Sequence, residues 1–253
     1  MGSTLRFEAA AGTHIGHVRK KNDDSFASLP KLGLFMVADG IGGRPGGEVA
    51  SRMAVDTVRT CFEEDDPEET WPYALDPSQE REEVQFVHAV RTANTAIFER
   101  AVRTPALRGM GTTFTGLYVR GDRAFIAHVG DSRGYRLRRG RLDQVTDDHS
   151  MLGEVRRHGV ELEDALDEGL SGILMRSVGT ERRVDVDTRV EVLVRGDVLL
   201  LCSDGLWEPV AEAELHATLS EDSSPEAMVE RLIGQALRHG ANDNVTCVVV
   251  RVS

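Results

Sequence analysis

The middle of the chain constrains the fold most strongly. Three strand-like segments, 112–119, 123–129 and 134–138, follow one another with only the short connections "RGD" and "GDS" between them. Connections this short join antiparallel neighbours, because a parallel pair needs a crossover of a dozen residues or more. A further turn, "RRGR", follows at 138–141. The sequence therefore predicts antiparallel sheets and argues against a doubly wound parallel fold.

The flanking segments add helices to these sheets. Apolar residues recur at helical spacing over 49–62, 80–102 and 225–239, whereas 5–11, 25–28, 33–38, 187–194, 197–202 and 245–252 have strand patterns. Strands in hairpin order with helices early and late predict an α+β layered fold. No repeat or linker divides the chain, so we expect one domain over residues 1–253. Prolines and acids interrupt the pattern at 63–84, which we interpret as an acidic insert in a solvated loop.

Composition limits the classes of function. The 253 residues carry a formal net charge of −12, which disfavours binding to nucleic acid or to an acidic membrane surface. The N-terminus lacks the pattern of a secretory signal, and apolar runs fall far short of the ~20 residues that span a bilayer. Cys61, Cys202 and Cys247 lie far apart in apolar segments, as expected for buried free thiols. We therefore expect a cytoplasmic protein.

Acids recur where apolar strands meet turns. Asp39, Asp131 and Asp204 each follow an apolar run, Asp243 precedes one, and Asp23 and Asp24 stand at a strand start. Each acid alone is ordinary turn chemistry, because aspartate tolerates turn conformations. Together they suggest a different function, because carboxylates gathered at one sheet edge repel each other unless a cation compensates them. Mg²⁺ and Mn²⁺ prefer oxygen ligands, and a pair of such ions supports phosphoryl transfer to water.

The stretch "VADGIGGRPGGE" at 37–48 allows a second interpretation. A strand, a glycine-rich loop and a helix form the phosphate-binding element of many nucleotide sites. A dinucleotide-binding pattern that starts at Gly40 requires glycine at position 45, where this chain has Pro45, which has no N–H to donate. The lysine of a P-loop is also missing. We therefore favour a metal-linked role for Asp39 over a nucleotide site.

The ordered motifs resemble a known family. "GHVRKKNDDS", "VADGIGGRPGGEVAS", "GMGTTFTG", "AHVGDSRGYRLRRG", "VTDDHS", "LMRSVGT", "LLLCSDGLWE" and "ANDNVTCVVV" follow one another over nearly the whole chain. In this order they resemble the bacterial form of the PP2C-type (PPM) metal-dependent protein serine/threonine phosphatases. The resemblance implies a four-layer αββα sandwich, with two antiparallel sheets flanked by helices and a two-metal site at one end.

The resemblance also implies roles for particular residues. Arg19 matches the arginine that binds the substrate phosphate, and Asp39 matches the carboxylate that bridges two Mn²⁺ or Mg²⁺ ions. Gly40 corresponds to the residue that offers its carbonyl to one ion. Asp204 and Asp243 match ligands of the other ion, and Asp23 and Asp24 match residues that support the metals. Asp131, with Asp204 and Glu208, matches a weaker third metal site. The implied reaction is direct attack of a metal-bridging hydroxide on phosphorus.

Several positions depart from the family pattern. Ile41 stands where some members have a histidine proposed as general acid, and Arg44 stands where histidine is frequent. For Arg44 we weigh a place near the site against a solvated surface position, and for His14 and His17 a functional role against a structural one. His149 matches its motif and is expected to be structural. Residues 150–173 correspond to the flap linked to substrate preference and contain acids where a basic run is common.

We therefore expect a phosphatase acting on phosphoserine and phosphothreonine in proteins and reversing a bacterial serine/threonine kinase. One alternative is a phosphatase of a sigma-factor-type regulator, and another is a catalytically silent binding module on the same fold. Phosphorylated proteins and a cognate kinase are the expected partners, and the expected state is monomeric. The cysteines take no part in the implied reaction.

Overall fold

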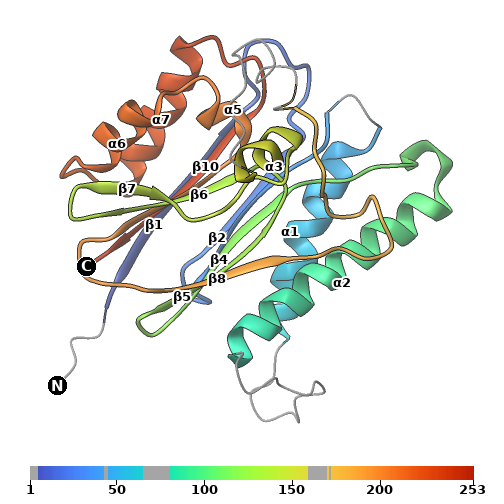
Figure 1. Cartoon of the computed structure of the whole chain (residues 1–253), viewed down its shortest axis with the longest axis horizontal. Helices are drawn as coiled ribbons and strands as arrows, with labels where there is room; N and C mark the ends of the chain where they lie inside the picture. The colour runs from blue at the N-terminus through green and yellow to red at the C-terminus, as the bar shows by residue number, and fades with distance from the viewer. Residues whose placement is uncertain (1–4, 43–44, 65–79, 159–169, 171) are drawn as a thin grey trace.

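The computed structural model describes residues 5–42, 45–64, 80–158, 170 and 172–253. It contains two five-stranded antiparallel sheets packed face to face between helices (Figure 1). The first sheet has the order β1 (Phe7–His14), β10 (Val245–Val252), β9 (Val198–Cys202), β6 (Arg133–Arg138) and β7 (Arg141–Gln144). The second has the order β2 (Asp24–Leu29), β3 (Leu34–Asp39), β4 (Phe114–Arg120), β5 (Arg123–Val129) and β8 (Asp187–Val192).

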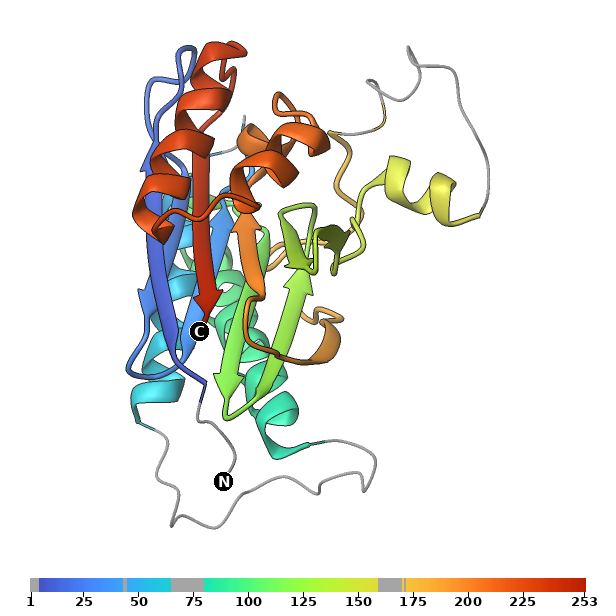
Figure 2. The same ribbon diagram turned by 90° about the vertical axis from the view of Figure 1, so that its left-hand side faces the viewer.

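Helices cover the outer face of each sheet. The long helices α1 (Gly47–Glu63) and α2 (Arg81–Arg103) cover the second sheet, and η1 (Pro105–Leu107) follows them. The short α5 (Asp204–Trp207), α6 (Glu212–Leu219) and α7 (Pro225–Arg238) cover the first sheet, and α7 lies in front of β1 and β10 in Figure 2. A further short helix, α3 (Met151–Arg157), lies between β7 and β8 in the chain. The predicted α+β sandwich of two antiparallel sheets between helices is confirmed.

The alternation of side chains along β3 shows why its sequence is apolar throughout. Leu34, Met36 and Ala38 pack into the core beneath α1 and α2, whereas Phe35 and Val37 pack into the core between the two sheets. Successive residues of a strand point to opposite faces, so a strand buried on both faces needs apolar residues at every position. This double burial fixes the end of β3, and Asp39 with it, between two packed layers.

Some elements differ from the sequence-based prediction. The "GDS" connection was expected to join antiparallel neighbours, but it carries the chain from β5 in the second sheet to β6 in the first, so these two strands do not pair. The "RRGR" turn joins β6 to β7 as a tight hairpin, with positive φ at Arg139 (51°) and Gly140 (77°). The strand β7 and the helix α6 were not predicted, because β7 is short and half polar and α6 lacks a strong apolar stripe. Within the described ranges, no helix has the length and apolar character to cross a membrane. Residues 65–79 of the acidic insert and 159–169 of the flap-like segment lie outside the described part.

Candidate active site

The two sheets bring their acids to one shared edge. Asp24, at the start of β2, lies directly opposite Asp39, at the end of β3. In the other sheet β9 ends just before Asp204, and its antiparallel neighbour β10 begins just after Asp243. Because antiparallel strands alternate direction, the end of one strand and the start of the next lie at the same edge.

A pocket of about 360 Å³ opens at this edge. Its lining includes one guanidinium and six carboxyl groups, from Arg19, Asp23, Asp39, Asp131, Asp204, Glu208 and Asp243. Gly40 and Ile41 line it as well, and Asp24 lies buried beside it. The structure thus brings together the residues to which the resemblance assigns metal or phosphate binding.

Backbone hydrogen bonds hold Asp39 in place. Its N–H donates to Thr113 Oγ1 (2.9 Å), and its carbonyl accepts from Thr113 N (2.8 Å) and Thr112 Oγ1 (2.8 Å). Both backbone polar groups are therefore satisfied by two threonines of the segment that leads into β4. The sequence analysis missed these threonines, although "GMGTT" belongs to a quoted motif.

Close packing explains the glycine that follows. The Gly40 N–H donates to the Asp23 carbonyl (3.1 Å), and a Cβ at position 40 would lie 2.7 Å from that same oxygen. It would also overlap the backbone of Gly47, where α1 begins. Only glycine fits between the end of β3 and the start of α1. The helix expected from the apolar spacing over 49–62 begins here, at Gly47.

Asn244 connects three parts of the site that are distant in sequence. Its Oδ1 accepts from the Asp23 N–H (2.8 Å), and its Nδ2 donates to the carbonyls of Ile15 (2.9 Å) and Lys21 (3.0 Å). The buried amide thereby fixes the loop that carries Arg19. Sequence reasoning missed this role, and only the position of Asn244 next to Asp243 pointed to it.

Ser203 supports Asp24 in the same way. Its hydroxyl donates to Asp24 Oδ2 (2.9 Å) and accepts from the Thr246 N–H (3.0 Å). The side chain therefore ties β2 of one sheet to β10 of the other. It also leaves the second Asp24 oxygen, Oδ1, buried with no hydrogen-bond partner among the described residues.

Arg19 lies at the rim of the pocket. Its side chain is 39% exposed and pairs with the Asp243 carboxylate. Its Nη1 approaches Gly42 so closely that a Cβ there would lie 2.9 Å away. Beside it, Lys21 Nζ pairs with Asp23 Oδ1 at 2.8 Å. The guanidinium is thus partly open to solvent and close to the acids.

The clustering of acids raises their pKa values. Burial, followed by the repulsion of neighbouring carboxylates, raises the pKa of Asp39 and of Asp131 well above the ordinary value. Burial raises the pKa of Asp24 to about 7 and that of Glu208 to about 7, with Asp204 adding repulsion in both cases. Burial also raises the pKa of Asp204, and repulsion from Asp243 adds to this shift. Burial and mutual repulsion therefore favour the protonated forms of these five acids when no cation is bound.

The donor set fits hard divalent cations. It consists of oxygen atoms, and two buried carboxylate oxygens, Asp24 Oδ1 and Asp204 Oδ1, have no hydrogen-bond partner within the described ranges. Unpaired carboxylate oxygens gathered at high density suit Mg²⁺ and Mn²⁺, which also retain bound waters. No three acidic, histidine or cysteine side chains of the described residues already form a metal cage. The fit therefore rests on the chemistry and burial of the donors.

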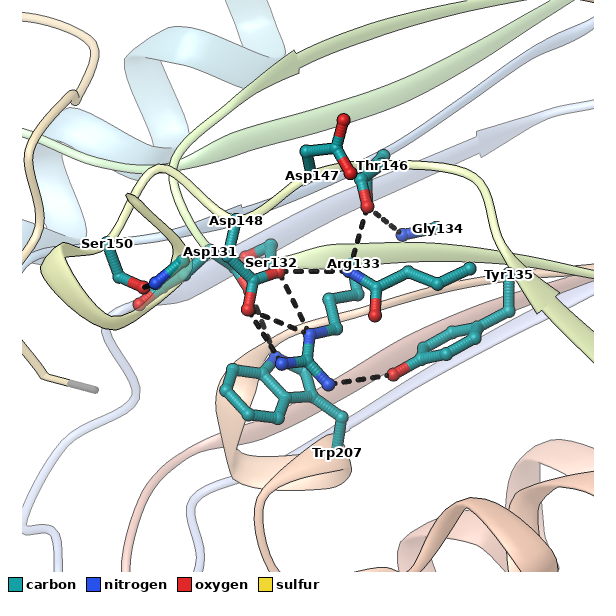
Figure 3. Close-up of polar contacts among 12 residues, drawn as sticks. Asp131, Ser132, Arg133, Gly134, Tyr135, Thr146, Asp147, Asp148, Ser150 and Trp207 are labelled. Atoms are coloured by element: carbon teal, nitrogen blue, oxygen red, sulfur yellow. Dashed lines mark hydrogen bonds and ion pairs between the residues drawn. The ribbon is translucent and has the colours of Figure 1, made fainter. Parts of the chain in front are cut away.

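A partly buried network of polar contacts lies next to Asp131 (Figure 3). The Trp207 indole N–H donates to the Asp131 carbonyl at 3.0 Å, and the Arg133 guanidinium lies 3.5 Å from the centre of the same ring system. Arg133 also binds Asp148 through two nitrogens, Nε and Nη2 (2.6 Å for the latter), and donates to Tyr135 Oη (3.1 Å). The sequence analysis missed this network, because nothing in the chain order brings Trp207 to Asp131.

The histidines lie outside the pocket. His14 Nδ1 accepts from Gly16 N–H (3.0 Å), and His17 Nε2 lies 3.1 Å from the Leu237 carbonyl. Buried His149 accepts from the Gly130 N–H through Nδ1 (3.0 Å) and contacts Asp187 through Nε2 (3.1 Å), in agreement with a structural role. Arg44 lies outside the described residues.

The three thiols are free, as predicted. Cys202 and Cys247 are buried opposite each other on β9 and β10, whereas Cys61 is only partly buried. Burial raises the pKa of the Cys202 thiol, so this side chain does not supply a thiolate nucleophile. The structure gives the cysteines no place in the acid pocket.

Comparisons with known proteins agree with the motifs and the fold. The family model "Protein phosphatase 2C" matches residues 11–239. Serine/threonine phosphatase stp of Listeria innocua is 36% identical over 94% of this chain and 93% of its own length. Among solved structures, PppA of Pseudomonas aeruginosa, a key regulatory component of T6SS, has a TM-score of 0.83 and 31% identity over 99% of both chains. The catalytic domain of PstP, solved in complex with 2 manganese ions, has a TM-score of 0.84 and 32% identity over 98% of this chain and 99% of that one.

Proposed function

The chain belongs to the protein phosphatase 2C family of serine/threonine phosphatases, and we propose that it removes phosphate from phosphoserine and phosphothreonine in proteins. The observation that carries the proposal is the pocket in which six carboxyl groups and Arg19 converge where the ends of both sheets meet. The related PstP catalytic domain was solved with 2 manganese ions, which supports a cofactor of two Mn²⁺ or Mg²⁺ ions, and we place these ions in the acid pocket of this chain.

The residues that would hold these ions are those with exposed or unpaired oxygens in the pocket. When bound, the ions would lower the pKa of a water molecule and offset the charge of the phosphate. Two of these acids have supports in the structure: two threonines bind the backbone of Asp39, and Ser203 donates to the Asp24 carboxylate. The proposed ligands and supports are Asp23, Asp24, Asp39, Asp204 and Asp243 with the Gly40 carbonyl, and Asp131 with Glu208 would serve a third ion.

Arg19 is the proposed phosphate-binding residue. A guanidinium offers planar paired donors that match two phosphate oxygens. Its ion pair with Asp243 orients it toward the pocket, and its partial exposure leaves donors for the substrate. Ile41 lines the pocket at the position where some family members have histidine, so this side chain supplies no proton to the leaving group.

The partners follow from the same chemistry. We propose phosphorylated proteins as substrates and a cognate serine/threonine kinase as the enzyme whose action is reversed. The monomeric state and the cytoplasmic location stay proposals of the same kind. The complete set of pocket acids argues against a catalytically silent binding module, which has no need to keep them.

Hydrolysis of a phosphothreonine peptide with added Mn²⁺ tests this function. Replacement of Arg19 by glutamine should raise KM and lower kcat/KM by about 10- to 100-fold, as expected for the loss of a charge-assisted phosphate contact worth ~1.5–3 kcal/mol. The matched control is Lys20→Gln, which removes the same charge from the neighbouring exposed residue. Equal activity of the two variants would refute the role of Arg19, and metal binding without turnover by the wild type would favour the silent module.

A further inference from the structure

A groove extends from the acid pocket along the protein surface. It has a volume of about 570 Å³ and shares Ile41, Gly172 and Leu174 with the pocket. It also shares Arg183, Val184 and Asp185 with a second hollow of about 460 Å³ beside α2. A continuous depression therefore leads from the proposed phosphate site to the exposed side of α2.

The wall of this groove is held rigidly. Asn94 of α2 is buried, accepts from the Gly179 N–H (2.7 Å) and donates to the carbonyls of Glu181 (3.1 Å) and Arg182 (3.3 Å). Figure 1 shows this segment passing beside α2 before it enters β8. The segment is thus fixed to the core before any ligand arrives.

The same wall is tied to the catalytic edge. Val178 and Thr112 exchange two backbone hydrogen bonds, of 2.8 and 3.0 Å, and the Thr112 hydroxyl donates to the Asp39 carbonyl. The position of the wall relative to Asp39 is therefore set by the fold. A substrate that occupies both places would meet a preformed surface, which lowers the entropy cost of binding.

Three exposed arginines gather around the second hollow. Arg91, Arg182 and Arg183 line it together with a single carboxylate, Asp185. None of the three guanidinium groups forms an ion pair with a residue that the structure describes, whereas Arg176 in the adjoining groove is paired with Asp187. In a chain with a net charge of −12, three such arginines in one place mark a local site for negative charge.

We propose that this arginine cluster, made of Arg91, Arg182 and Arg183, binds acidic residues that flank the phosphorylated residue of a protein substrate. The proposal rests on the proposed function and specifies its substrate class. An extended peptide advances by ~3.3 Å per residue, so a short segment can follow the groove while its phosphate occupies the acid pocket. Glu181 and Asp185, which also line the groove, would repel acidic residues, so the acidic flank is expected to lie over the three arginines of the second hollow and not along the whole groove.

The test compares matched phosphothreonine peptides. One pair carries glutamate or glutamine on the N-terminal side of the phosphothreonine, and a second pair carries them on the C-terminal side. Exposed ion pairs contribute ~0.2–1 kcal/mol each, so the wild type should prefer the acidic peptide of one pair by about 3- to 10-fold in kcat/KM. The preference should weaken as ionic strength rises, because salt screens exposed charges.

The variant Arg91→Gln/Arg182→Gln/Arg183→Gln should reduce that preference to about 1 while leaving the hydrolysis of p-nitrophenyl phosphate unchanged. The matched control is Arg120→Gln, which removes an exposed arginine from the far end of β4, ~20 Å along the strand from the pocket, and should keep the preference. The single variant Arg183→Gln should show a partial loss and serves as a second test.

The proposal is overturned if the wild type shows no preference in either pair, or if the triple variant retains it. These outcomes are distinct from failure of the proposed function itself, which would appear as no metal-dependent hydrolysis of p-nitrophenyl phosphate by the wild type. A loss of p-nitrophenyl phosphate hydrolysis in the triple variant would also overturn the proposal, because it would place the arginines in the general catalytic machinery.

Discussion

The substitution Asp24→Asn tests whether the burial and mutual repulsion of the pocket carboxylates destabilise the folded protein when no metal is added. Burial raises the pKa of Asp24 from 3.8 to about 7, and Asp204 adds repulsion. Between these two values the folded protein holds more protons than the unfolded chain, so stability falls as pH rises through this window. The raised pKa costs the folded protein about 4 kcal/mol at pH 8 and about 2 kcal/mol at pH 5.

Asparagine removes the charge and keeps an oxygen that can accept from Ser203. Any cost from an imperfect hydrogen bond is the same at both pH values, so the difference between them isolates the charge. We expect Asp24→Asn to be stabilised relative to the wild type by about 2–3 kcal/mol more at pH 8 than at pH 5. Its free energy of unfolding, minus that of the wild type, should therefore increase as pH rises.

Urea denaturation in the presence of chelator measures this difference directly. The matched control is Asp56→Asn on α1, where the carboxylate is 49% exposed and pairs with Arg59, and where we expect little change at either pH. The reasoning is refuted if Asp24→Asn changes stability by the same amount at pH 5 and pH 8, or if its relative stability falls as pH rises.

Two further predictions concern the supports of the site. Gly40→Ala places a Cβ against the backbone at the start of α1, so we expect a loss of about 1–3 kcal/mol or more in thermal or urea unfolding, and an unchanged melting temperature would contradict the packing. Arg133→Lys keeps a positive charge but loses the planar contact with Trp207 and the two-nitrogen contact with Asp148. In a Trp71→Phe background, the Trp207 emission should shift to longer wavelength as the ring gains solvent, and an emission identical to that of the parent would show that the stacking is not needed.

The antiparallel character of the fold could be predicted from the sequence because two short connections join paired strands, whereas the equally short "GDS" connection crosses from one sheet to the other. The hairpin between β4 and β5 and the tight turn between β6 and β7 leave no room for crossovers. The missed elements are those whose local pattern is weak. Strand β7 is a polar edge strand, and α6 shows almost no segregation of apolar and polar faces, so each exists because of its neighbours.

The candidate site also contains residues that the sequence predicted and residues that it did not. The acids were predictable because each stands at the end of an apolar strand, and antiparallel pairing places such ends together. Their supports were not, because Asn244 and Ser203 act on segments more than a hundred residues away in sequence. The arginine cluster was also missed, since Arg91 meets Arg183 only after α2 packs beside the segment that leads into β8.

The central claim is that the pocket acids hold divalent ions that the phosphatase reaction needs. The most direct measurement is phosphate release from a phosphothreonine peptide by metal-stripped protein as Mn²⁺ is added back, for wild type and for Asp39→Asn. The account predicts no turnover without metal, saturable recovery in the wild type, and a loss of at least about 100-fold in Asp39→Asn at the same Mn²⁺ concentration. Turnover that persists in chelator, or an Asp39→Asn variant that recovers as the wild type does, would contradict it.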